Sequence, residues 1–483
     1  MLTDLSFLSP GAAWPPESEK ERLKGYEDNR KLFEADHAEV FQASLKRLVR
    51  SAEEYGLPVP TSYELCVNYP RLISTSTAGL LFNRAPGIVA GEENDAEAME
   101  RISDISERSD LMGVLYSAAI DVSRYGSALL YVHADMEGET MIDLSRPDLW
   151  FPVMDGANIR HVLYHVLATP YAINENGEKR RFLRVEIHGR GSVETRDYRM
   201  ESGALGTLLA SQKRSTGLDD FAIIPVHNIR PSDCAFGISD YEDVQSLVCE
   251  LEVRLGQISK VLDRHSDPSM QGPDSGLTDV KTDDGSVARV FIPGKYFINQ
   301  VAGYQGEIKY ITWDAQMEAN FKYIEKLLDA IRVISEMGAL LGDMSAMGAV
   351  PSGAAMRRML YPAIAKISRI RNSFTPAIRK AVRLAGQLSG LDMANRPIYI
   401  DWPDTLPRDP QEMAQIANLR TGGKQTQSIK RALMDMDELS EEEAEKELES
   451  IREEQTEAMP LLDSPNADDT EDTEDTADRR EGV

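Results

Sequence analysis

Two histidines four residues apart, His161 and His165, form the first pair in this 483-residue chain that could bind a metal ion. They lie in a run with strand-like composition, so both would share one face of a sheet. A zinc site needs a third ligand, and hydrolysis needs a base such as the glutamate of H-E-x-x-H, but Val162 stands in its place. We therefore interpret the pair as half-buried sheet residues.

Two glycine-containing segments approach nucleotide-binding motifs without completing them. A phosphate-binding loop needs G-x-x-x-x-G-K-[ST], but Gln425 follows Gly423–Lys424 and Asn418 replaces the first glycine. Gly189–Arg190–Gly191 begins a dinucleotide fingerprint, but Glu194 replaces its third glycine. The sequence thus predicts no catalytic residues, no cofactor and no metal, and it favours a protein that is not an enzyme.

Cysteine use and hydropathy restrict the class of protein further. Cys66, Cys234 and Cys249 are odd in number and form no C-x-x-C pair, which argues against a disulfide framework and favours a reducing compartment. The first ten residues lack a basic segment followed by an apolar run, so we expect no signal peptide. No window reaches about 18 uncharged apolar residues, so we expect no membrane span.

The net charge of −27 is concentrated at the C-terminal end. Residues 438–457 contribute −8 and residues 463–483 contribute −7, so the rest of the chain is only mildly acidic. This balance gives no sign of nucleic-acid binding through phosphate contacts. The repeated "DDTEDTEDTAD" after Pro460 predicts a disordered acidic tail over residues 461–483.

Hydrophobic periodicity predicts a mostly helical α+β fold. Residues 1–16 have the composition of a loop, and helical patterns follow over 17–54, 70–83 and 94–125. Strand-like segments come next and suggest an α+β domain that ends near residue 237. These segments are 127–132, 150–154, 159–167, 181–188, 193–199 and 221–225.

Two long amphipathic helices are predicted over residues 240–264 and 315–337, on either side of a small β-rich unit. Each has an apolar stripe, which must pack against the other helix or against copies of the chain in an oligomer. The stripes contain Leu251, Leu255, Ile258, Ile324, Leu328 and Ile331.

The segment "LLGDMSAMGAVPSGAAM", residues 340–356, is too rich in glycine for a stable helix and too apolar for an ordinary surface loop. The sequence predicts a long helix from Ser352 to about Ser389, with bends at Pro362 and Pro376. Beyond it, Asp409–Pro410 predicts a helix start, and Gly422–Gly423 predicts its end.

Six segments, in order along the chain, resemble the portal (head-to-tail connector) proteins of tailed bacteriophages, of the type found in long-tailed phages. They are "YEDNRKLFEADH", "NYPRLISTSTAGLLFNRAP", "RYGSALLYV", "EVRLGQISKVLDRHSDP", "NFKYIEKLLDAIRVISEMGALLG…PSGAAMRRML" and "IDWPDTLPRDPQEMAQIANL". None is a catalytic signature, and the resemblance covers nearly the whole chain except its two ends.

In that family, twelve copies form a ring around a channel for double-stranded DNA, and each subunit has a wing, a stem, a clip and a crown. The resemblance divides this chain into an N-terminal loop (1–16), wing (17–237), first stem helix (238–265), clip (266–314), second stem helix (315–337), tunnel loop (338–352), long helix with a return to the wing (353–404), helical crown (405–460) and disordered tail (461–483).

The resemblance also implies partners and a location. They are other copies of the chain, DNA that passes without sequence preference, the terminase large subunit, head–tail adaptors, and the major capsid and scaffold proteins. The protein would stand at one capsid vertex of the virion after assembly in the host cytoplasm, with no membrane partner. Another phage head or scaffold-type structural protein is the alternative.

The tunnel loop is expected to face DNA through Leu341, Gly342, Asp343, Met344 and Met347. Residues 338–352 contain no lysine or arginine, and phosphate contacts from such residues would hold the duplex in place. Methionine offers an adaptable surface, although methionines that fill a gap between helices would give the same composition.

Eight basic residues and no acidic residue lie between Met344 and Leu391. Pairing with an acidic surface of a neighbouring subunit, contact with DNA, and plain solvation all remain open for them. The candidates that we single out are Arg357, Arg358, Lys366, Arg369 and Arg371.

Overall fold

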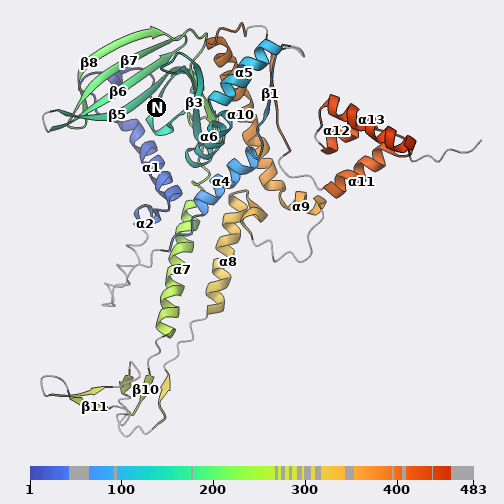
Figure 1. Ribbon diagram of the computed structural model, residues 1–483. Helices are drawn as coiled ribbons and strands as arrows, with labels where there is room; N and C mark the ends of the chain where they lie inside the picture. The colour runs from blue at the N-terminus through green and yellow to red at the C-terminus, as the bar shows by residue number, and fades with distance from the viewer. Residues whose placement is uncertain are drawn as a thin grey trace, which may run out of the picture. The chain divides into compact units, whose positions relative to one another are not determined.

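The computed structural model (Figure 1) describes residues 1–42, 65–91, 95–175, 178–266, 270–273, 278–281, 286–290, 296–298, 306–310, 317–342, 353–393, 396–404, 410–437 and 439–457. The prediction of a mostly helical α+β chain is confirmed. The chain divides into two compact units, Met1–Leu406 and Pro407–Val483.

The largest core of the first unit packs four helices against a three-stranded antiparallel sheet of order β3–β2–β9. The strands are β2 (Ser127–Ala134), β3 (Thr140–Ser145) and β9 (Ile223–His227). The helices are α4 (Tyr69–Leu81), α5 (Ala96–Arg108), α6 (Leu111–Tyr125) and α10 (Tyr361–Leu388). A two-stranded ribbon, β1 (Gly87–Ala90) with β15 (Ile398–Asp401), joins this region to the chain that follows α10.

A five-stranded antiparallel meander forms a second core. Its strands are β4 (Trp150–Met154), β5 (Val162–Glu175), β6 (Glu178–Gly189), β7 (Ser192–Glu201) and β8 (Ala204–Ser215). The N-terminal residues are not a free loop: Leu2 bridges Val153, and Leu8 is buried in this core.

The two long helical patterns near the N-terminus are each interrupted by one residue in the left-handed region. Ala35 (φ 72°) separates α1 (Lys20–Glu34) from α2 (His37–Val40), and residues 43–54 of the predicted helix lie outside the described residues. Asp110 (φ 44°) separates α5 from α6, and its carboxylate accepts the Gly113 backbone N–H as a helix cap.

The two amphipathic helices predicted from their stripes are α7 (Gln245–Ser266) and α8 (Met317–Ile334), which pack side by side (Figure 1). Residues 241–244 form turns instead of the first helical residues. The β-rich segment between them contains β10 (Met270–Gly272), β13 (Tyr296–Ile298) and β14 (Lys309–Tyr310) in one sheet, and β11 (Thr278–Lys281) with β12 (Val287–Val290) in another.

The predicted long helix is two helices, α9 (Gly353–Met359) and α10, which are separated at Leu360. Pro362 lies in the first turn of α10, where its missing N–H costs no helical hydrogen bond, whereas Pro376 lies inside the helix. No described helix is long and apolar enough to cross a membrane.

The second unit contains α11 (Pro410–Thr421), α12 (Ile429–Asp437) and α13 (Glu441–Glu457). The helix α11 ends directly before Gly422, as the sequence predicts. Ser440 and Glu443 form a reciprocal capping box at the start of α13. Residues 458–483, which include the predicted disordered tail, lie outside the described residues.

Candidate functional site

All six predicted stripe residues of α7 and α8 lie in or against one apolar cluster. Leu251, Ile258, Ile324 and Ile331 are buried, while Leu255 and Leu328 are partly buried and pack against them. Leu32 of α1, Phe41 directly after α2, and Tyr241 in the turn before α7 belong to the same cluster. Of the two arrangements left open for these stripes, packing within one chain therefore accounts for these side chains.

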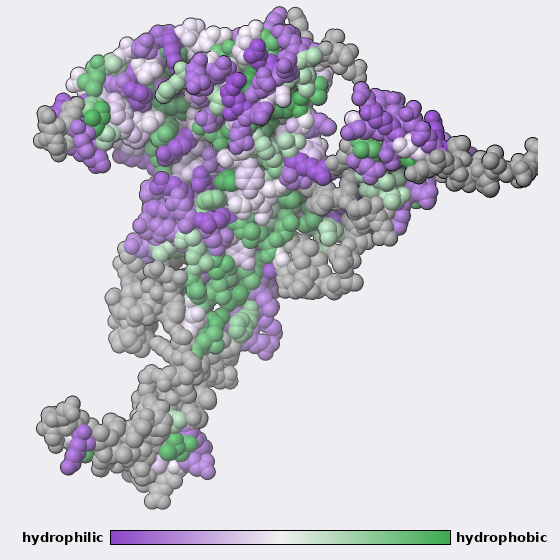
Figure 2. Space-filling view, viewed as in Figure 1, coloured by the Kyte–Doolittle hydropathy of each residue, from purple (hydrophilic) through white to green (hydrophobic). Residues whose placement is uncertain are grey.

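Several apolar side chains of α8 stay exposed in the single chain. Figure 2 shows hydrophobic surface over the α7–α8 pair. Val333 is 75% exposed, and Phe321, Tyr323 and Ile334 are each between 44% and 49% exposed. Tyr361, at the start of α10, is 68% exposed. Tyr323 contacts Glu250 and Arg254 of α7, whereas Val333 points away from the buried stripe and is the most exposed of these side chains.

Lys366 of α10 is a buried cation that joins both long helices. Its Nζ lies 2.8 Å from Oδ2 of Asp240, just before α7, and donates at 3.2 Å to the carbonyl oxygen of Ser335, just after α8. The side chains of Lys366 and Asp240 are 2% and 8% exposed. The end of α8 and the approach to α7 are thus held to the same point on α10. We call Lys366, Asp240 and Ser335 the stem junction.

Neighbouring polar groups also form hydrogen bonds with the Asp240 carboxylate. Its carboxylate also accepts hydrogen bonds from Oγ of Ser123 at 2.7 Å and from Nδ2 of Asn228 at 2.8 Å. Ser123 in turn contacts Ser74, whose Oγ lies 2.7 Å from the hydroxyl of Tyr241. Burial raises the pKa of Tyr241, which keeps this hydroxyl neutral. A buried carboxylate is stable only with such partners, and this one has three.

Arg369, one turn after Lys366, binds Glu336, two residues after the end of α8. Its guanidinium donates to both carboxylate oxygens of Glu336, which has a left-handed backbone (φ 60°). This pair is about 38% exposed on both sides. Hydrogen bonding to Glu336 raises the pKa of Arg369, so the guanidinium keeps its charge. Two consecutive turns of α10 therefore contact the end of α8.

The structure corrects the grouping of the five basic candidates. Lys366 is buried and Arg369 is paired inside the chain, while Arg371 donates to the Pro403 carbonyl at 2.8 Å and stacks over Trp402. The physical reason is that their partners are far away in the sequence, so the local charge pattern does not reveal them. Arg357 and Arg358 on α9 are exposed, and neither forms an ion pair with another described residue.

Two other basic residues of the same run are also paired within the chain. Lys380 lies 2.7 Å from Asp220, and Arg383 lies 2.7 Å from Asp219. Four of the eight basic residues in the segment without acidic residues are thus paired with acids elsewhere in the same subunit.

Only the start of the predicted tunnel loop (338–352), residues 338–342, lies within the described residues. Leu341 ends the short helix η5 (Gly338–Leu341) and is 7% exposed in a cluster with Ile73, Val244 and Met337. Leu341 is therefore a core residue and does not face a channel, which corrects the expectation for it. Gly342 is half-buried, and Asp343, Met344 and Met347 lie outside the described residues.

The histidine pair is split between two environments. His161 is exposed and precedes β5, whereas His165 is buried inside β5. Nε1 of Trp150 donates to Nδ1 of His165 at 3.2 Å, and the two rings stack. Burial lowers the pKa of His165 to about 3. The expectation of two half-buried residues on one face is thus wrong, because the strand begins only at Val162.

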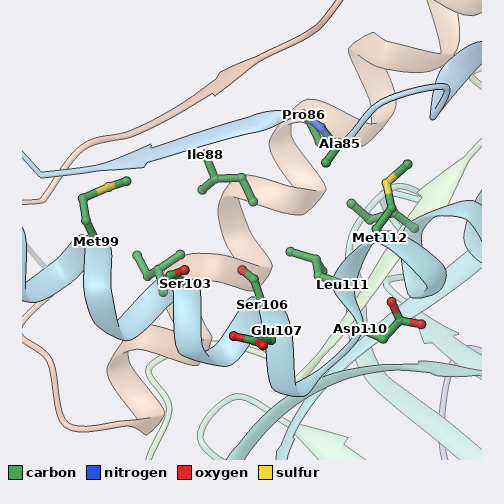
Figure 3. A pocket seen from close by; sticks show the side chains of 12 residues that line it. Ala85, Pro86, Ile88, Met99, Ser103, Ser106, Glu107, Asp110, Leu111 and Met112 are labelled. Atoms are coloured by element: carbon green, nitrogen blue, oxygen red, sulfur yellow. The ribbon is translucent and has the colours of Figure 1, made fainter. Parts of the chain in front are cut away.

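A cavity of about 490 Å³ lies between β1, α5 and α6 (Figure 3). Its lining is mostly apolar, with Ile88, Met99 and Leu111 among its walls. The polar lining residues are Ser103, Ser106, Glu107 and Asp110. Asp110 already caps α6, and neither a histidine nor a lysine lines the cavity to activate a serine. The lining residues thus do not form the pair of nucleophile and base that acyl transfer requires.

Sequence reasoning missed the two partners of Lys366 in the stem junction, the Asp240 carboxylate and the Ser335 carbonyl. Asp240 stands in an ordinary turn-like segment, and Ser335 and Glu336 follow the end of a helix. The one available signal was Asp240 itself, an acid directly before a strongly apolar helical pattern. No local spacing connects it to Lys366.

The comparisons with known proteins identify one family. The family model "Phage portal protein, SPP1 Gp6-like" matches residues 17–460. Among curated proteins, none matches the sequence.

Solved structures of gene transfer agent (GTA) particles contain similar chains. One, titled "Virion of native gene transfer agent (GTA) particle", has 14% identity and a TM-score of 0.40, and the match covers 76% of this chain and 88% of that chain. A second, "Neck of native GTA particle computed with C12 symmetry", has 14% identity and a TM-score of 0.39, with 76% and 87% covered.

Proposed function

The chain belongs to the SPP1 Gp6-like family of phage portal proteins, and from this premise we propose that it forms a ring at one capsid vertex. Double-stranded viral DNA would enter the capsid through this ring and leave through it at ejection. The observation that carries the proposal is the family match over residues 17–460, which includes the α7–α8 pair, the β-rich segment between them, and α10.

The exposed apolar surface of α8 supports assembly into a ring. Val333 is 75% exposed in the single chain, and Ile334 and Phe321 are about half exposed, although another stripe of the same helix is buried against α7. Burial of such side chains against a neighbouring copy contributes about 25 cal/mol for each Å² removed from water. A closed ring of twelve subunits, the number that the resemblance to the family implies, would cover these side chains on every subunit.

The stem junction would fix the start of the tunnel loop. Lys366 and Arg369 hold the end of α8, and residues 343–352 connect that end to α9. Asp343, Met344 and Met347 remain our proposed DNA-facing residues. The loop lacks lysine and arginine, so it would contact the duplex without strong phosphate binding.

The remaining partners follow from the same premise. The β-rich segment, residues 266–314, would dock the terminase motor during packaging and head–tail adaptors afterwards. The major capsid and scaffold proteins would surround the ring in the virion, after assembly in the host cytoplasm. Energy for translocation would come from a separate ATPase, and this chain would act as a structural protein, not as an enzyme.

Particle mass and negative-stain images of the purified full-length protein test the proposal. We expect closed rings with a central channel and a mass of about twelve chains. A monomer or dimer at micromolar concentration, with no ring in the images, would favour the alternative of another phage head or scaffold-type protein.

A further inference from the structure

Three segments that are distant in the sequence bring metal-binding side chains together beside α7. His37 begins α2, Cys66 lies in the extended segment before α4, and Glu252 lies within α7. One ligand atom from each of the three lies within 4.8 Å of the other two. His37 is 2% exposed and Glu252 is 8% exposed, while Cys66 is open to solvent.

The hydrogen bonds of His37 determine which ring nitrogen faces the cluster. Nε2 lies 2.8 Å from the carbonyl oxygen of Leu32, which only accepts, so Nε2 carries a proton. In the neutral imidazole, Nδ1 then presents a lone pair. This nitrogen lies 2.6 Å from Oε1 of Glu252, which also accepts the Val67 N–H at 2.9 Å.

A lone pair and a carboxylate oxygen at this distance repel each other unless a positive charge lies between them. A proton on Nδ1 supplies that charge and makes a buried ion pair. A metal ion supplies it as well, and a backbone carbonyl that orients the second ring nitrogen is the usual support for a metal-binding histidine. An ion pair needs no thiol, whereas a metal ion would use the Cys66 sulfur as its third ligand.

We propose that His37 Nδ1, Glu252 and Cys66 Sγ bind one zinc ion, with solvent at the fourth position. Nitrogen, thiolate and carboxylate are the ligand types that Zn²⁺ prefers, at about 2.0–2.3 Å. A tetrahedral site separates such ligands by roughly 3.3–3.6 Å, so Nδ1 and Oε1 move apart by under about 1 Å. On binding, the thiol releases its proton to solvent and becomes the thiolate ligand.

Zinc here would cross-link α2, the segment before α4, and α7. The site lies against the apolar cluster of the α7–α8 pair, since Phe41, one turn from His37, belongs to that cluster. Bound metal would thus stabilise the folded chain by mass action. The proposal does not depend on ring formation, because all three ligands belong to one subunit.

Isothermal titration of the full-length, chelator-treated protein with ZnCl₂ tests the site. We expect one zinc ion per chain, binding at least about tenfold weaker in Cys66→Ser. Cys66 is exposed, so this variant should fold normally in the presence of chelator. Cys234→Ser is the matched control, because Cys234 is another accessible thiol outside the cluster, and its zinc binding should equal that of the wild type.

Cobalt provides an independent readout. CoCl₂ should give a thiolate-to-cobalt charge-transfer band in the wild type and in Cys234→Ser, and the band should be lost in Cys66→Ser. Equal zinc affinity in the wild type and Cys66→Ser, as binding by the acidic tail would give, overturns the proposal. Absence of both zinc binding and the cobalt band also overturns it and leaves a His37–Glu252 ion pair.

Discussion

At the scale of single residues, the stem junction depends on a charge that has almost no access to water. Lys366 and Asp240 are both removed from solvent, and their attraction must offset the cost of desolvation. Loss of one partner would leave the other charge buried, although Ser123 and Asn228 would still donate to Asp240.

Replacement of Lys366 by methionine should therefore lower the free energy of unfolding by about 3–5 kcal/mol, the usual cost of breaking a buried pair. The matched control is Lys380→Met on the same helix, whose ion pair with Asp220 is about 30% exposed and should contribute about 0–1 kcal/mol. Chemical denaturation of both variants provides the comparison. Equal stability losses would show that burial does not govern the role of Lys366.

Two histidines with lowered pKa values, the buried His165 and the half-buried His227, should make the protein sensitive to acid. Burial lowers the pKa of each to about 3, whereas an unfolded chain titrates near about 6.5. Below that pH the unfolded chain binds more protons than the native chain. Stability should thus be complete above pH ~6.5 and fall by about 1.4 kcal/mol per pH unit per histidine until pH ~3.

Denaturation of His165→Gln across pH 4–7 tests this dependence. The glutamine can still accept from Trp150 but does not titrate, so the acid-induced loss of stability should become shallower. His161→Gln is the control, since His161 is exposed, and it should follow the wild-type pH profile. If His165→Gln keeps the wild-type dependence of stability on pH, titration of His165 is not a cause of the acid-induced loss.

Single residues also show where sequence reasoning was limited. The basic character of Lys366 was evident, but its burial was not, because the acid that neutralises it belongs to a different segment. Likewise, Leu341 was assigned to a loop on account of neighbouring glycines, while its side chain completes a cluster with α4 and the turn before α7. Long-range packing determined both outcomes.

At the scale of elements, α8 has apolar side chains on a buried face and on an exposed face. Ile331 is fully buried against α7, whereas Val333, two residues away, is 75% exposed. The first face holds the helix pair together, and the second is the surface that we propose to be covered by a neighbouring copy.

Aspartate at these two positions should separate folding from assembly. Ile331→Asp places an unpaired charge in the core and should lower the melting temperature of the subunit itself. Val333→Asp should leave the fold unchanged but reduce the fraction of rings at a given concentration. Size-exclusion chromatography and thermal denaturation distinguish the two. Normal ring yield in Val333→Asp would exclude this face from the interface.

Element types were more predictable than element boundaries. The stripes of α7 and α8 and the extent of β4 could be predicted, because periodicity and β-branched or aromatic composition act locally. The strand β8 was missed, since nearly all its side chains are exposed and no alternation marks it. The breaks at Ala35 and Asp110 were also missed, because either residue is compatible with a continuous helix.

At the scale of the whole molecule, the family assignment made from six ordered segments is confirmed by the match over residues 17–460. That order was informative because portal proteins have no catalytic signature, so only the succession of elements identifies them. The division into wing, stem, clip and crown remains a proposal, as do the partners of the ring.

The last prediction concerns the passage of DNA through the proposed ring. If residues 343–352 line the channel, Met344→Lys adds one cation per subunit next to the duplex. Each phosphate that becomes neutralised releases a counterion and increases affinity, so the ring should hold DNA in place. We expect normal ring assembly with reduced packaging and ejection, and we expect the defect to ease as salt rises.

Met136→Lys is the matched control, because Met136 is fully exposed in the turn between β2 and β3 and its replacement adds the same charge elsewhere. This variant should package normally at every salt concentration. If Met344 instead fills a gap between helices, Met344→Lys should lower the melting temperature of the ring, and salt should not restore packaging. Ring melting and packaging, measured across one salt series, therefore decide between a DNA-facing tunnel loop and a packing role for Met344. Normal packaging by Met344→Lys at low salt would exclude the DNA-facing tunnel loop.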